Sequence, residues 1–118
     1  MCDRLQLITL RQPSPEVVVL DLCGFISAGF EKAFDNIRGG LHNLAAPHVV
    51  LNFTAVQGID GTGLKQLLIF CTLMRKLNRK LAAYGVNPEV RRVFELTRMD
   101  SILQNCEDEF DALNLEGA

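Results

Sequence analysis

The chain has 118 residues, of which 48% are hydrophobic and 22% are charged, and its formal net charge at pH 7 is −2. This length and mixture predict one globular domain over residues 1–118, with no need of a metal ion or a disulfide to fold. The lack of a basic excess argues against a nucleic-acid partner. No apolar run reaches the roughly 18 residues of a membrane span, so direct membrane insertion is not expected.

The cysteines bear on the cellular compartment. Cys2, Cys23, Cys71 and Cys106 lie far apart, and three of them fall within apolar stretches, which is typical of small buried side chains. Such usage suits a reducing compartment. The N-terminus also lacks the apolar run of a signal peptide. The sequence therefore predicts a cytoplasmic protein.

Two short apolar runs open the chain. Residues 5–10 alternate roughly between apolar and polar side chains, whereas residues 17–22 are β-branched and almost wholly apolar. Both patterns predict strands. The segment between them holds Pro13 and Pro15, which indicates a turn or loop. The short link favours an antiparallel hairpin.

A helical repeat follows over residues 28–45. Its apolar side chains step by three and four positions and so share one face: Phe30, Phe34, Ile37, Leu41 and Leu44. Gly39 and Gly40 would allow this helix to kink or end early. Pro47 stops it, and residues 48–53 predict a third strand.

The second half repeats the alternation. A helix is expected to run to about Asn78, with a strand at 81–86 and a third helix that begins at Pro88. Residues 101–103 predict a weak fifth strand, and residues 107–115 predict a short acidic helix. Arg75, Lys76, Arg79 and Lys80 crowd the end of the second helix; they indicate either a solvated helix terminus or a contact for phosphate or an acidic partner.

The order of these elements predicts an α/β fold. The strands near 17, 48 and 80 begin about 30 residues apart, the length of one βαβ unit. Such spacing implies parallel strands joined by right-handed crossovers. We therefore expect a small mixed sheet of four or five strands, with parallel central strands and about four helices.

The glycine-rich segment Gly58–Gly63 resembles a phosphate-binding loop in spacing alone. A Walker A motif needs Lys directly after its second glycine, where this chain has Leu64. The dinucleotide pattern also fails, because Gln66 stands at its third glycine. No nucleotide cofactor is predicted.

The same segment still predicts an exposed helix start. Asp60 is a good N-cap, which places Gly61, Thr62 and Gly63 in the first turn. Two glycines there disfavour a helix by roughly 1 kcal/mol each, so their missing side chains could serve to leave the Thr62 hydroxyl accessible. A phosphate on Thr62 would lie at the positive end of the helix dipole. The alternative is a tight strand-to-helix turn in which Thr62 has no role.

Other chemistry is not indicated. His42 and His48 flank a predicted helix end and are expected on the surface or as capping residues, with no third ligand at metal-site spacing. No nucleophile, base and orienting group can be nominated from their order in the chain. The sequence thus predicts a binding module without metal or cofactor rather than an enzyme.

Two segments resemble a known family. An apolar strand that ends in Asn and Phe, Val49–Phe53, is followed after a short gap by Gly58–Leu64, and both are similar to the signature of the STAS domain of bacterial anti-sigma-factor antagonists. Asn87–Met99 resembles a later segment of that family, with its Pro, basic pair and Phe. The likeness covers about residues 5 to 115.

The resemblance implies a phosphorylation switch in transcription regulation. A partner kinase, itself an anti-sigma factor and the holder of any ATP, would phosphorylate Thr62, and the unmodified form would bind that partner. The implied partner-binding residues are Asp60, Gly61, Thr62, Gly63, Ser27 and Lys65. The alternative is a constitutive STAS scaffold, such as a stressosome component or the cytoplasmic subunit of a lipid-transport ABC system. A second copy of this chain is also an expected partner, in a homodimer or a larger assembly.

This chain departs from the family signature at three positions. Gly61 replaces the first Ser of the usual pair. Thr62 replaces the more common Ser. After the second strand the family often has an Asp in a loop that contacts the kinase, where this chain has Ser27.

Overall fold

A five-stranded mixed sheet forms the centre of the computed structural model, which describes residues 7–42 and 44–113. The strands lie side by side in chain order: β1 (Ile8–Ser14), β2 (Val17–Ile26), β3 (His48–Ile59), β4 (Lys80–Tyr84) and β5 (Gln104–Cys106). β1 is antiparallel to β2, and the pairs from β2 to β5 are parallel. The predicted hairpin and the mixed sheet with parallel central strands are confirmed.

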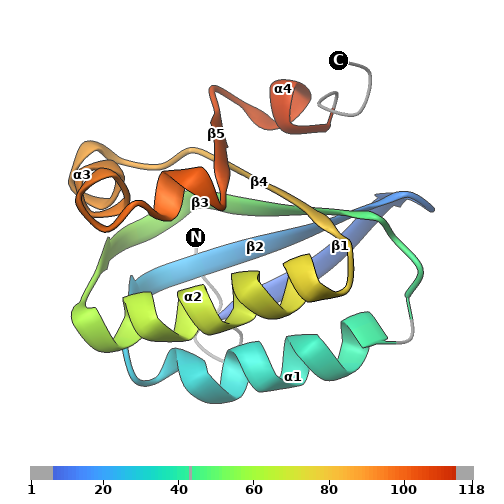
Figure 1. Cartoon of the computed structure of the whole chain (residues 1–118), viewed down its shortest axis with the longest axis horizontal. Helices are drawn as coiled ribbons and strands as arrows, with labels where there is room; N and C mark the ends of the chain where they lie inside the picture. Colours follow the sequence, from blue (N-terminus) through green and yellow to red (C-terminus); the bar gives the residue numbers. More distant parts are fainter. Residues whose placement is uncertain (1–6, 43, 114–118) are drawn as a thin grey trace.

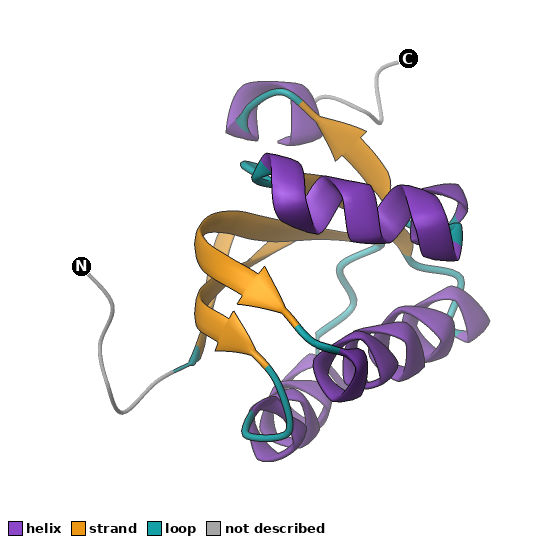
Figure 2. Ribbon diagram, turned by 90° about the vertical axis from the view of Figure 1, so that its left-hand side faces the viewer, coloured by secondary structure: helices purple, strands orange, loops and turns teal. Residues whose placement is uncertain are grey.

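The helices lie on both sides of this sheet. They are α1 (Phe30–His42), α2 (Gly61–Lys76), α3 (Pro88–Thr97) and α4 (Glu109–Leu113), with a 3₁₀ turn at Met99–Ser101. Figure 1 shows α1 and α2 running side by side along one face of the sheet, and α4 beyond the other face. Figure 2 shows the same layers from the side.

Two hydrophobic cores result from this layering. The larger core joins alternate side chains of the strands to α1, α2 and α3, and it includes an edge-on contact of Phe53 with Phe94 at 5.6 Å between ring centroids. The smaller core lies on the opposite face and brings Val50, Ala82 and Tyr84 against Ala112 of α4. Strand residues that point alternately to both faces therefore meet apolar side chains on each.

The strand boundaries correct three expectations. β1 continues through Pro13 to Ser14, whereas the strand was expected to end at residue 10. Proline has no N–H group to donate, and an edge strand tolerates this because one of its sides needs no hydrogen bond partner. β3 runs to Ile59, so residues 54–59 are strand rather than loop. The strand predicted at 101–103 is wrong, since the 3₁₀ turn ends at Ser101 and β5 begins only at Gln104.

The helix ends show why α1 and α2 stop where they do. α1 passes through Gly39 and Gly40 to His42, and α2 ends before Asn78, whose φ of 61° is left-handed. The Nη2 atom of Arg79 donates hydrogen bonds to the carbonyl oxygens of Leu41 and Leu44 at 2.8 and 2.7 Å. One member of the basic cluster thus stabilises the C-terminal end of α1.

The histidine and cysteine expectations hold in part. His48 is buried rather than exposed, and the side chain of His42 lies outside the described residues. Cys71 and Cys106 are free thiols, and burial raises the pKa of Cys71 to about 12. Cys23 is disulfide-bonded, so it is not the simple buried thiol that was expected.

Polar side chains fasten α4 to the sheet. The Arg11 Nη2 atom donates to Asp21 at 2.9 Å and to Glu109 of α4 at 2.7 Å. The Tyr84 hydroxyl donates to the same Glu109 carboxylate at 3.1 Å. Burial and the bond to Glu109 raise the pKa of Tyr84 to about 12, against 10.0 for the free side chain. The short helix α4 therefore depends on one carboxylate for two of its contacts.

We expect Glu109→Gln to lower the pKa of Tyr84, because the carboxylate that disfavours the phenolate is lost. Arg11→Gln should raise this pKa, because the Arg11 charge favours the phenolate. Tyr84 is the only tyrosine and the chain has no tryptophan, so ultraviolet absorbance of the phenolate reports this group alone. Equal shifts in both variants would contradict the contact network.

The raised pKa also fixes a pH dependence. Between pH 10.0 and about 12 the folded chain keeps the Tyr84 proton that the unfolded chain has lost. The raised pKa therefore contributes fully to the free energy of unfolding below pH 10.0, and this contribution is lost as the pH rises through about 12. Circular dichroism during the same titration measures this decline.

Candidate functional site

The predicted site lies at the junction between β3 and α2. Asp60 caps α2 with extended backbone angles, φ −105° and ψ −179°. Its Oδ1 atom accepts a hydrogen bond from the Gly63 N–H at 2.8 Å, and its own N–H donates to the Ile26 carbonyl at 3.1 Å. The predicted N-cap is confirmed. The bond to Ile26 also brings the end of β2 against the start of α2.

Gly63 and Gly61 have different surroundings. A Cβ atom on Gly63 would lie 1.9 Å from the Ile26 carbonyl oxygen and 2.8 Å from the Ser27 nitrogen, far inside van der Waals contact. A Cβ on Gly61 would meet no atom within 4 Å. Gly63 is buried and lets β2 and α2 approach each other, so it does not clear space around Thr62 as expected. Gly61 is exposed and does leave its surroundings open.

Thr62 lies at the second helical position with its side chain exposed. Its hydroxyl forms no hydrogen bond with the other residues that the structure describes. Lys65 is exposed one turn further along α2, at the spacing that places two side chains on one helix face. Ser27 is half-buried beside Gly63. The six predicted residues are therefore neighbours, although Gly63 lies beneath the surface.

Apolar residues that sequence reasoning missed extend this surface. Leu68 and Ile69 of α2 are 42% and 47% exposed, and Phe25 at the end of β2 is 52% exposed. Phe25 is the register partner of Gly58, where an added Cβ would lie 2.8 Å from the Phe25 ring. Leu68 and Ile69 are neighbours on the outer face of α2, and exposed apolar side chains that cluster are typical of protein-binding surfaces. In the sequence, the available signal was an aromatic residue shortly before the predicted contact residue Ser27.

The first turn of α2 has the chemistry of an anion-binding end. Asp60 satisfies the N–H of Gly63, and the N–H groups of Gly61 and Thr62 are among those that a helix leaves without internal partners. These groups and the helix dipole favour a negative group on the Thr62 hydroxyl. Asp60 adds a like charge close by. A phosphate here would thus be held by the backbone and would greatly change the local charge.

Two further observations concern metal ions and membranes. Within residues 7–42 and 44–113, no three His, Cys, Asp or Glu side chains come together as a metal site would require. None of the helices in that same part of the chain combines the length and apolar character needed for a membrane crossing.

Known proteins share this architecture. The STAS domain family model matches residues 8–112. The anti-sigma factor antagonist SpoIIAA in its unphosphorylated form aligns with a TM-score of 0.77 at 19% identity, over 94% of this chain and 97% of that one. The phosphorylated form of SpoIIAA, a Bacillus cell fate determinant, gives 0.66 at 19%, over 91% and 96%.

A sulfate transporter family protein from Wolinella succinogenes has the same fold, with a TM-score of 0.71 at 16% identity over 90% of this chain and 89% of that one. At such identities the likeness concerns the fold. No curated protein has a sequence that matches this chain. The family model spans nearly the whole described chain, and the five-stranded mixed sheet with its four helices agrees with it. The chain belongs to the STAS domain family.

Proposed function

We propose that this protein is a signalling protein of the anti-sigma-factor antagonist type, which changes partners when Thr62 is phosphorylated. The observation that carries the proposal is the exposed Thr62 hydroxyl in the open first turn of α2. The partner is a kinase-type anti-sigma factor that supplies the phosphoryl group from ATP. The protein itself binds no cofactor and catalyses no reaction, and we place it in a bacterial cytoplasm. Because Cys23 forms a disulfide, the cysteines no longer support a reducing compartment.

The surface around Thr62 suits this role. Thr62 and Lys65 share the outer face of α2 with Leu68 and Ile69, so a hydroxyl, a cation and two apolar side chains are presented together. Ser27 directly follows Ile26, the last residue of β2. An apolar centre with polar groups around it is the usual anatomy of a protein interface. The proposed docking surface therefore consists of Ser27, Asp60, Gly61, Thr62, Lys65, Leu68 and Ile69.

Phosphorylation would act on this surface through charge. A phosphate adds about −1.5 to −2 charges near neutral pH, beside an Asp60 carboxylate that is already engaged as the N-cap. The first-turn N–H groups hold the phosphate, so α2 keeps its start while the docking surface becomes strongly anionic. A partner that packs on Leu68 and Ile69 would then bury the phosphate of Thr62 without a cation to pair with it. The cost of burying this unpaired charge would make the partner dissociate.

The direct test is mass spectrometry of the protein isolated from its native host under conditions that activate and silence the pathway. We expect phosphothreonine at Thr62 in one condition and unmodified Thr62 in the other. Thr72, which is also exposed on α2, is the internal control and should stay unmodified. Absence of phosphate at Thr62 under every condition, or equal modification of Thr72, would refute the switch.

The second candidate is a constitutive STAS scaffold or docking subunit, and the Wolinella succinogenes transporter-family structure is the observation that favours it. Such a protein would use the same surface without modification. Co-purification with a membrane transport complex, or a large homo-assembly in size-exclusion chromatography, would support it. A monomer or dimer that binds one soluble kinase would support the switch.

A further inference from the structure

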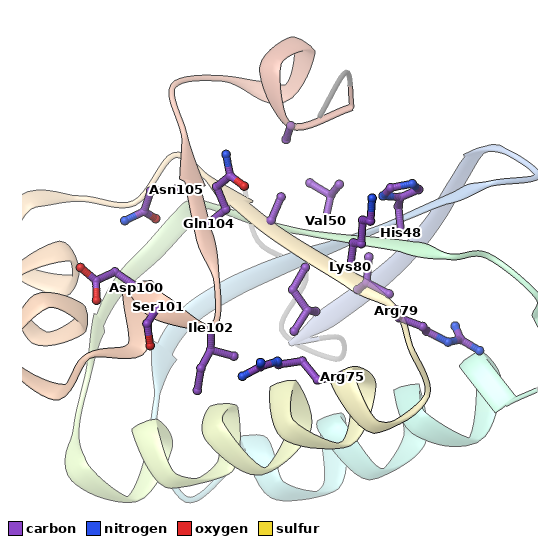
Figure 3. A pocket seen from close by; sticks show the side chains of 14 residues that line it. His48, Val50, Arg75, Arg79, Lys80, Asp100, Ser101, Ile102, Gln104 and Asn105 are labelled. Carbon is purple, nitrogen blue, oxygen red and sulfur yellow. The ribbon is translucent and has the colours of Figure 1, made fainter. Parts of the chain in front are cut away.

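A basic cleft of about 690 Å³ lies at the end of the sheet opposite to Thr62. Its walls are the first residues of β3 and β4, the last turn of α2, and the segment from the 3₁₀ turn to β5 (Figure 3). Thr62 and Arg75 are separated by about 20 Å along α2 at the usual helical rise. The cleft is therefore separate from the proposed docking surface.

Cationic side chains dominate this cleft. Arg75, Arg79 and Lys80 line it together with the buried His48, whereas Asp100 is the acidic residue among the described lining. Figure 3 shows the Arg75 side chain directed toward Ile102 on the α2 side of β4, and the Lys80 side chain on the other side of the strand near His48. The Asp100 carboxylate is turned away toward α3. Positive charge thus approaches the cleft from both sides of β4.

These cations lack anionic partners within the described part of the chain. The salt bridges found there are formed by Arg11 and Arg38, not by Arg75 or Lys80. Arg79 lies at the rim, where its Nη2 atom binds the end of α1 and its Nη1 atom is buried without a hydrogen bond partner. Unpaired cations around a concave space favour an anionic ligand, because each guanidinium and ammonium gains a charge-assisted hydrogen bond.

The cleft also offers backbone groups and an apolar wall. β5 pairs with β4 only from Ala82 onward, so the edge of Lys80 and Leu81 is left open by β5. The apolar lining consists of Val49, Val50, Leu81, Ala82, Ile102 and Ala112. A volume of several hundred Å³ with apolar walls and a few convergent polar groups is typical of a small-molecule site. His48 is the sole ring among the described lining residues and it is buried, so this lining offers no exposed aromatic face to a nucleobase.

We propose that this cleft binds a small organic phosphate. The phosphate is held by Arg75 or Lys80, whose donors suit its oxygens, and the carbon body lies against Val50, Ala82 and Ile102. This site resolves the choice that the sequence left open for the basic cluster. Arg79 secures α1, while Arg75 and Lys80 form a ligand site.

The test is a titration of the isotope-labelled protein with butyl phosphate and with inorganic phosphate, followed by NMR in a chloride buffer of low ionic strength. The amides of Val49, Lys80, Leu81 and Ile102 should shift, whereas those of Thr62 and Gly63 should not. Butyl phosphate should bind more tightly than inorganic phosphate, because its carbon body gains the apolar wall. Equal affinities, or shifts confined to the start of α2, would overturn the assignment.

Charge-matched variants separate this site from general electrostatics. Arg75→Gln with Lys80→Gln should weaken butyl phosphate binding roughly tenfold or more, since the charge-assisted contact to the phosphate is lost whichever of the two side chains makes it. Lys76→Gln with Arg92→Gln removes the same charge from exposed positions outside the cleft and should change the Kd by less than about twofold. Equal weakening by both pairs would refute the site. Circular dichroism verifies that each variant is folded, and neither result bears on Thr62.

Discussion

Thr62→Glu is expected to weaken binding to the proposed partner about 100-fold, which corresponds to about 2.8 kcal/mol. The new carboxylate would lie within the interface, where an uncompensated charge costs several kcal/mol. The isolated protein should not lose stability, because an acidic side chain in the first helical turn is favourable by about 0.3–1 kcal/mol. Lost binding by an equally stable protein would separate the switch from unfolding.

The measurement is an affinity capture from the native host with wild type and Thr62→Glu in parallel, followed by titration of the purified partner. Thr72→Glu supplies the matched control, because it adds the same charge to another exposed threonine of α2. Because Thr72 lies one turn beyond Leu68 and Ile69, at the margin of the docking surface, Thr72→Glu should raise the Kd by less than about tenfold, well short of the effect of Thr62→Glu. Thr62→Val should retain binding and resist phosphorylation. Partner binding that survives Thr62→Glu would exclude a charge switch at this position.

The sequence predicted the elements whose signals are local. The hydrophobic repeat that begins at Phe30, the Pro88 start of α3 and the Asp60 cap are each encoded within a few residues, and each is confirmed. The spacing of the strands then sufficed for the parallel sheet, because a crossover helix of ordinary length leaves few alternatives. These features depend on patterns that propensity and capping rules describe directly.

The missed features depend on contacts between distant residues. β3 extends to Ile59 because the end of β2 pairs with it and the Phe25 ring covers Gly58, which a local reading takes for a turn residue. The apolar pattern at 101–103 suggested a strand, but a 3₁₀ turn precedes β5, and Leu103 is buried in the larger core instead. Tertiary packing overrides propensity in both segments.

The sequence predicted where the residues of the candidate site lie, but it gave the wrong reason for one of its glycines. Asp60, Thr62 and Lys65 occupy the expected helix start, yet the purpose assigned to Gly63 was wrong. Its missing side chain makes room for the Ile26 carbonyl, a residue far away in the sequence. The same close approach brings Ser27 to the first turn of α2. The glycine therefore positions the site through backbone packing.

Gly63→Ala should consequently be among the most destabilising single substitutions in this chain. Its Cβ would lie 1.9 Å from the Ile26 oxygen, so α2 or the end of β2 must move. Overpacking against backbone costs about 1–3 kcal/mol or more, and the better helix propensity of Ala offsets only about 1 kcal/mol. We expect a net loss of about 2 kcal/mol in the free energy of unfolding. Chemical denaturation measures this loss, and thermal unfolding should show a Tm lower by roughly 8 °C.

Gly61→Ala provides the control with the opposite sign. Ala at position 61 meets no atom within 4 Å and lies in the first turn of α2, so it should leave stability unchanged or raise it by up to about 1 kcal/mol. The two substitutions lie two positions apart in the same helical turn, and only the Cβ at position 63 would meet the backbone of Ile26 and Ser27. Equal effects of the two substitutions would mean that the junction is loose and that Ser27 is not held beside Thr62. A loss specific to Gly63→Ala would establish that this glycine sets the distance between the two halves of the docking surface.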